Sequence, residues 1–145
     1  MVNAQDIRVH SPRVLGAVTL VTSGTATTST GGVDMGGTGS GNYAYFLVRF
    51  GTNAATGNLS SITVDTSDNG STWVSGPNLL SAPLLTDPLD DRAINIAADG
   101  RNARFVRLTL TTTSAANTVI SYVEGFRVGN QIVPPPALGA DLALV

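Results

Sequence analysis

The chain has 145 residues, a formal net charge of −2, 12% charged residues, one histidine and no cysteine, which suits a single domain. Disulfides and thiolate metal sites are therefore excluded, no basic cluster favours nucleic acid as a partner, and neither a membrane helix nor a secretory signal is expected. Small and β-branched residues dominate while lysine is missing, so the composition predicts an all-β protein.

The N-terminal part predicts an arm followed by short strands. Residues 1–13 are expected to form the arm, and residues 14–21 (V-L-G-A-V-T-L-V) a strand apolar enough to be buried on both faces. Residues 22–30 fit either an edge strand or a loop. We expect a short strand over residues 31–35, followed by a glycine-rich turn.

Residues 43–50 (Y-A-Y-F-L-V-R-F) are the strongest predicted strand. Side chains alternate between the two faces of a strand, so the run has two distinct sides. The expected core side holds Ala44, Phe46, Val48 and Phe50. The opposite side holds Tyr45, Leu47 and Arg49.

Residues 63–73 (T-V-D-T-S-D-N-G-S-T-W) predict a β-hairpin. Val64 alternates with polar neighbours, and Asp68-Asn69-Gly70 supplies the turn. Asp and Asn bond their own backbone there, and Gly70 adopts positive φ without steric cost. The indole of Trp73 is expected to fold over the hairpin and anchor it in the core.

The C-terminal half predicts a long crossing loop and three further strands. Residues 76–91 contain three prolines and are expected to form the loop. Strands are expected over 93–97, 103–111 and 119–128, with a register break possible in the second, where Phe105 departs from the alternation. Arg104 and Arg107, an odd number apart, are expected on opposite faces, either pairing with aspartates across strands or facing an interface.

About eight strands and no useful helix predict an all-β fold, a two-sheet antiparallel jelly-roll sandwich with extended N- and C-terminal arms. The predicted sandwich covers residues 14–130, between the arms 1–13 and 131–145. Three consecutive prolines, 134–136, favour polyproline II, which cannot join the middle of a sheet.

Few residues can support catalysis, so we do not expect an enzyme. His10 is the only histidine, no G-x-S-x-G occurs, and the chain lacks lysine and cysteine. The glycine-rich run 36–41 is not a phosphate loop, because a strand follows it and no lysine can reach a phosphate. No cofactor is expected.

The densest acidic group, Asp87, Asp90 and Asp91, allows two interpretations. Carboxylates of this kind ligate calcium, or they cap turns and pair with Arg92. We favour the second interpretation and predict no metal site. Asp65 and Asp68 are weaker candidates for an ion, since Asp68 is already explained by the turn.

The arms are the predicted contact regions. Leucines of the C-terminal arm leave apolar surface that can dock on a neighbour, contributing about 1.5–3 kcal/mol for each buried leucine, although a frayed tail is the alternative. The predicted partner contacts are Arg8, His10, Arg13, Pro134, Pro135, Pro136, Leu138, Leu142 and Leu144.

Two resemblances come from the hairpin and the strands after it. The pattern Thr66-x-Asp68-x-Gly70-x-Thr72-Trp73 resembles the Asp-box hairpin of sialidase propellers, which occurs once here. Together with A-R-F-V-R-L (residues 103–108) and E-G-F-R-V-G (residues 124–129), it resembles the second half of galactose-binding-like, discoidin-type jelly rolls. That family's cysteine pair is absent, so sugar or lipid binding is not carried over.

The whole chain resembles small virion proteins of tailed bacteriophages, particularly capsid decoration (cement) proteins. The shared features are G-V-D-M-G (residues 32–36), the strand ending at Phe50-Gly51, the S-D-N-G-S-T-W hairpin and R-F-V-R-L (residues 104–108). The resemblance implies a non-enzymatic protein on the capsid surface of a virion. It further implies major capsid protein as the partner and a homotrimer that stabilises the shell.

Two alternatives remain at this point. One is a carbohydrate-binding or adhesin-type β-sandwich module, which needs exposed aromatic side chains, whereas aromatic residues make up only 6% of the chain. The other is a tail or neck structural protein of a virion, which shares the same assembly logic.

Overall fold

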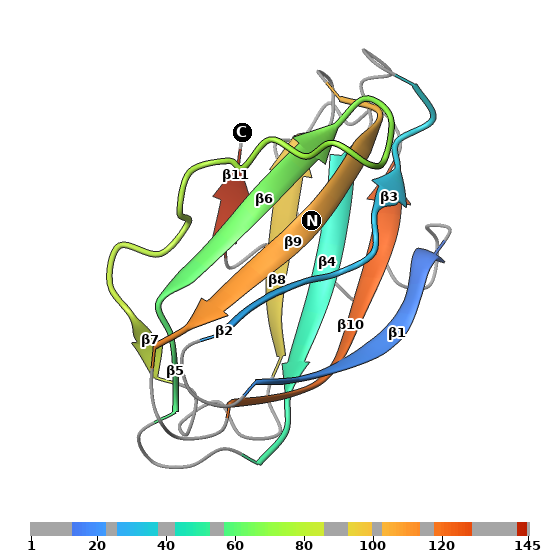
Figure 1. Cartoon of the computed structure of the whole chain (residues 1–145). Coiled ribbons are helices and arrows are strands. Elements are labelled where there is room, and N and C mark those ends of the chain that lie inside the picture. The colour runs from blue at the N-terminus through green and yellow to red at the C-terminus, as the bar shows by residue number, and fades with distance from the viewer. Residues whose placement is uncertain are drawn as a thin grey trace.

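The chain forms a sandwich of two β-sheets (Figure 1) in a computed structural model that describes residues 13–22, 26–37, 43–52, 57–85, 93–99, 103–113, 118–128 and 142–144. The described residues contain strands, turns and bends but no helix. The predicted all-β, two-sheet sandwich is therefore confirmed.

The larger sheet has five strands in the order β1-β10-β4-β8-β11. All neighbours are antiparallel except β8 and β11, which run parallel. The strands are β1 (Arg13–Thr22), β4 (Tyr43–Phe50), β8 (Ala93–Asp99), β10 (Thr118–Val128) and β11 (Leu142–Leu144).

The second sheet is built around β9, which pairs with β6 along one edge and with β2 and β3 along the other. Its strands are β2 (Ala26–Ser29), β3 (Val33–Asp34), β6 (Ser61–Ser67) and β9 (Phe105–Thr112). A small ribbon joins β5 (Asn58–Leu59) to β7 (Leu84–Leu85).

The connections give the jelly-roll wrap that the sequence predicted. From β1 to β10 the chain crosses from one sheet to the other at each step, through β2/β3, β4, β6, β8 and β9, and the first of these strands pairs with the last. The eighth position is occupied by residues 74–78, which meet the free edge of β6 at the bridges Thr66↔Val74 and Thr63↔Asn78. Between these bridges, Gly76 N donates a single hydrogen bond to Val64 O. The predicted return strand of the hairpin is thus reduced to an irregular edge.

The core lies between the sheets and uses the face of β4 that the sequence predicted. Ala44, Phe46, Val48 and Phe50 are fully buried and belong to one cluster with apolar side chains of β6 and β9, including Ile62, Val64, Val106, Leu108 and Leu110. On the opposite face Arg49 is exposed, whereas Tyr45 and Leu47 are also buried. The strand is therefore covered on both sides for much of its length.

Three expectations need correction. β9 alternates strictly between buried and half-buried residues, so the register break considered near Phe105 is wrong. Register shifts occur instead between β1 and β10 and between β10 and β4. The sheets are not wholly antiparallel. Residues 142–144, in the predicted C-terminal arm, form a parallel strand on β8 of the same chain.

We expect Leu108→Ala to destabilise the fold by about 2–5 kcal/mol, because Leu108 is fully buried between the sheets and its removal leaves a cavity. Val74→Ala is the matched control, since Val74 is 67% exposed and should change stability by less than about 0.5 kcal/mol. Chemical denaturation followed by tryptophan fluorescence measures both. Equal losses would contradict the position of the core.

Candidate functional site

The outer face of the β2–β9–β6 sheet carries a band of hydroxyl side chains, which we call the hydroxyl face. Alternation creates it, because the even-numbered apolar residues of β6 and β9 turn inward and leave the odd-numbered polar residues outside. The face comprises Thr27, Ser29, Ser61, Thr63, Asp65, Arg107, Thr109 and Thr111.

The strand register places these side chains in rows across the sheet. Ser29 and Thr63 both pair with Thr109, and Thr27 pairs with Thr111. The hydroxyls of Ser29 and Thr109 lie 2.7 Å apart, and those of Thr27 and Thr111 lie 3.1 Å apart. Much of the hydrogen-bonding capacity of the face is therefore satisfied within the sheet.

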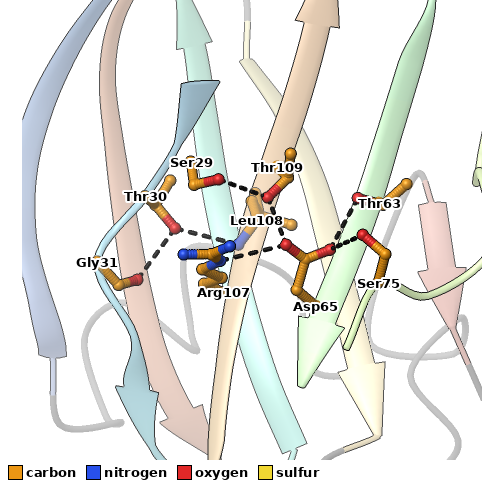
Figure 2. A network of polar contacts seen from close by, with 9 residues as sticks. All are labelled: Ser29, Thr30, Gly31, Thr63, Asp65, Ser75, Arg107, Leu108 and Thr109. Carbon is orange, nitrogen blue, oxygen red and sulfur yellow. Dashed lines mark hydrogen bonds and ion pairs between the residues drawn. The ribbon is translucent and has the colours of Figure 1, made fainter. Parts of the chain in front are cut away.

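Asp65 is the centre of this network (Figure 2) and is only 2% exposed. Oδ1 accepts hydrogen bonds of 3.0 Å from the hydroxyls of Thr63 and Ser75. Oδ2 accepts from Thr109 Oγ1 at 2.6 Å and from Arg107 Nε at 3.2 Å. Because Thr109 donates its proton to Asp65, the Ser29 hydroxyl must donate to Thr109, which extends the network to β2.

The pKa of Asp65 lies below the ordinary value of an aspartate. Burial acts in the opposite direction and is the largest single influence, since it disfavours the charged form. Hydrogen bonds from Thr109, Thr63, Ser75 and Arg107 together outweigh it. Asp65 is therefore an ionised structural group, and both its oxygens are already occupied, which disfavours it as a general base or a cation ligand.

Arg107 connects this network to the hairpin. Its guanidinium carbon lies 4.3 Å from the centroid of the Trp73 ring, a cation–π geometry. Trp73 is half-buried and lies outside the core cluster, so the prediction that it anchors the core is wrong. The indole instead packs against the outer side of the sheet, where it contacts the guanidinium of Arg107 and the backbone at Gly32.

Gly32 provides the space for the indole. A Cβ atom at this position would lie 2.9 Å from Cη2 and 3.3 Å from Cζ2 of Trp73.

Between β2 and β3 the chain uses one more residue than the facing part of β9, since Ser29 pairs with Thr109 but Val33 pairs with Val106. Thr30 repairs the interrupted ladder, because its backbone NH donates to Leu108 O and its hydroxyl accepts from Leu108 N.

The hairpin turn is closed by Ser67 and Asn69 rather than by Asp68. Asn69 Oδ1 accepts from the backbone NH groups of Ser71 at 2.9 Å and Thr72 at 2.8 Å, and Ser67 Oγ accepts from Gly70 N at 2.9 Å. Gly70 has φ of 74°, as predicted. The expectation that Asp68 stabilises the turn through its side chain is wrong, since the carboxylate is exposed and bonds no described residue.

An open hollow of about 330 Å³ lies beside this turn. Its walls expose about as much polar as apolar surface and come from the end of β6, the returning chain and Ala103, which precedes β9. They include Thr66, Ser67, Asp68, Asn69, Thr72 and Val74. The hollow contains one carboxylate among hydroxyl and amide groups, which suits hydrogen bonding to a polar ligand better than acid–base chemistry.

Of the two roles considered for Arg104 and Arg107, the structure shows pairing with aspartates across strands. Arg107 pairs with the buried Asp65, whereas Arg104 pairs with Asp34 at 3.5 Å with both side chains about half exposed. The described residues contain no group of three or more His, Cys, Asp or Glu side chains placed to hold a metal ion. They also contain no helix with the length and apolar character needed to cross a membrane.

Most predicted contact residues of the arms lie outside the described residues. These are Arg8, His10, Pro134, Pro135, Pro136 and Leu138, together with the acidic group Asp87, Asp90 and Asp91. Arg13 begins β1 opposite Phe126, and Leu142 and Leu144 belong to β11. The hydroxyl face was not predicted as a site, although the T-x-T and S-x-T-x-D patterns of its strands contained the signal.

No protein-family model matches the chain, and no curated protein matches its sequence. Among solved structures, a chain of infectious bursal disease virus, Gx strain, is similar with a TM-score of 0.48 and 10% identity over 86% of this chain and 34% of that one. The Clostridium thermocellum endo-1,4-β-D-xylanase 10B CBM22-1–GH10 modules, complexed with xylohexaose, give 0.43 and 15% over 86% and 26%. At these scores neither likeness supports a functional assignment.

We expect Asp65→Asn to destabilise the fold by about 1.5–3 kcal/mol at neutral pH, because the new amide presents a donor to groups that already donate. The folded-state pKa is lowered, so the contribution of the carboxylate is complete above the ordinary pKa of 3.8 and is lost as pH falls through the folded value. The melting temperature of the native chain should therefore fall more steeply below about pH 4 than that of the variant. Asp68→Asn, at an exposed carboxylate, should leave the native profile unchanged; identical profiles for all three proteins would contradict the network.

We expect Gly32→Ala to cost about 1–3 kcal/mol, because the added methyl group meets the rigid indole of Trp73. The loss should shrink in a Trp73→Phe background, since phenylalanine lacks the atoms that clash. Thermal denaturation of the four proteins in this double-mutant cycle gives the coupling between the two sites. Additive losses would show that the indole does not occupy this position.

Proposed function

We propose that the chain is a non-enzymatic structural protein of a virion that decorates the outer surface of a shell of major capsid protein and stabilises it as a homotrimer. The observation that carries this proposal is the hydroxyl face, whose buried carboxylate is fully bonded within the sheet. Such a face suits packing against another surface. Its carboxylate already accepts hydrogen bonds at both oxygens and is therefore poorly placed to act on a substrate.

The side chains of this face favour permanent burial. Serine and threonine lose little rotamer entropy on contact, and their hydroxyls are largely paired before any partner arrives. Docking then leaves few unsatisfied polar groups, which are the main cost of burying a polar surface. Only 12% of the residues of the chain are charged, which also lowers the cost of burying its surface against a partner.

The size of the face indicates how binding would become strong. The face has a central strand of eight residues between strands of seven and four residues. At a strand spacing of about 4.8 Å it covers roughly 310 Å², below the roughly 800 Å² that each partner buries in a stable interface. One face therefore binds weakly by itself. Trimer formation and contacts from the arms would add area, and joined contacts gain strength through multivalency.

A second candidate function, a carbohydrate-binding module, is favoured by the hollow beside the hairpin turn. Its hydroxyl, amide and carboxylate groups are of the kinds that bind sugar hydroxyls, and the half-buried Trp73 lies on the same hairpin. Saturable binding on a glycan array, without affinity for viral particles, would favour this function over decoration.

We expect the purified chain to co-sediment with particles of the virus that encodes it, and Thr27→Glu to weaken that binding about tenfold or more. Thr27 is an exposed member of the hydroxyl face, so the variant would bury an unpaired charge at the interface without touching Asp65. Ser81→Glu adds the same charge at an exposed site outside the face and should bind normally.

Occupancy on particles is measured by quantitative gel analysis, and the heat resistance of the particles by a dye-release assay. Absence of the chain from sedimented particles would overturn the proposal. Equal binding by both glutamate variants would instead exclude the hydroxyl face as the contact while leaving decoration in place.

A further inference from the structure

Strand β11 occupies an unusual position in the fold. It is a three-residue parallel strand on the outer edge of β8, pairing Leu142 with Ile96, Ala143 with Ala97 and Leu144 with Ala98. Every other strand pairing described in the structure is antiparallel. β11 also lies at the far side of the sheet from β10, the strand that precedes it (Figure 1).

The register gives the distance that the chain must cover between these two strands. Val128, at the end of β10, is level with Tyr43 and Asp99, while Leu142 pairs with Ile96. The start of β11 is thus three strand spacings to the side, about 14 Å, and three residues back, about 10 Å. The direct span is about 17 Å.

The connecting residues 129–141 are much longer than this span requires. About thirteen residues can extend to roughly 45 Å, more than twice the distance. Three of them are the consecutive prolines 134–136, and proline-rich sequences act as extended, semi-rigid spacers. The length therefore permits β11 to reach an edge of β8 that belongs to another molecule.

We propose that β11 is an exchangeable strand, which pairs with β8 of its own chain in dilute solution and with β8 of a second copy in the assembled protein. The pairing groups are the same in both states, so exchange adds the link between copies at little cost. The edge of β8 is the receptor surface, and its occupant is the C-terminal strand of the same sequence.

Local concentration decides between the two states. A link of this length holds β11 at an effective concentration in the millimolar range, so exchange is expected only where copies are similarly concentrated. A decorated shell provides that condition. This part of the inference rests on the proposed function, whereas exchange in concentrated solution does not.

A disulfide across the β8–β11 pair tests the proposal. Paired residues of neighbouring strands lie about 4.8 Å apart, within the Cα separation that a disulfide spans, and the natural chain has no cysteine to interfere. Ala97→Cys and Ala143→Cys are made in separate molecules, which are mixed in equal amounts and oxidised. A disulfide between position 97 of one molecule and position 143 of another forms at the native strand pairing only if β11 has exchanged between the two molecules. Ala98→Cys with Leu144→Cys is a second pair, should the first reduce folding.

We expect dimers that are cross-linked between positions 97 and 143, identified by mass spectrometry of the linked peptides, to increase about tenfold or more between about 1 µM and 1 mM and to form on particles. A mixture of Ala143→Cys with Ser81→Cys, at an exposed position, is the control for random collision. Dimers no more abundant than in that control, at 1 mM and on particles, would overturn strand exchange. Binding to particles without cross-links leaves decoration standing; cross-links in solution without binding to particles leave exchange standing alone.

Discussion

The buried carboxylate of Asp65 is the constraint on which the second sheet depends. A charge in this position is tolerated only if its oxygens are fully bonded, and the four donors come from β6, β9 and the edge segment beside β6. Through Thr109 the same network reaches β2. One ionised group therefore links β2, β6, β9 and the segment beside β6 on the outer side of that sheet.

The packing of Trp73 follows from this arrangement. Arg107 is oriented by its bond to Asp65, and its guanidinium then supports the indole. The indole in turn requires a residue without a Cβ atom at position 32, in the segment with the extra residue between β2 and β3. A polar contact in the middle of the sheet thus sets a steric requirement on the segment that joins β2 to β3.

The sequence predicted the parts of the fold that local patterns control. The strand 43–50 has the predicted bounds and core face, because eight alternating residues contain their own signal. Gly70 was predictable from turn chemistry. β5, β7 and β11 were missed, since strands of two or three residues form only when a distant partner is in place.

The candidate site was harder to predict than the fold. Asp65 and its network span residues 29 to 109, so their meeting depends on strand register rather than on a motif. The pairing of arginine with aspartate could be considered from the sequence. Strand periodicity limits which face of the sheet Arg107, in β9, and Arg104, just before β9, can occupy.

The pairing of β1 with β10 has a consequence for biosynthesis. Its partners, such as Thr22 and Thr118, are separated by almost a hundred residues, so the first strand waits without its neighbour until most of the chain has left the ribosome. Such long-range contacts slow folding and leave an unpaired strand edge exposed meanwhile. Until β10 emerges, the unpaired edge of β1 is open to pairing with other chains, so aggregation competes with folding during synthesis.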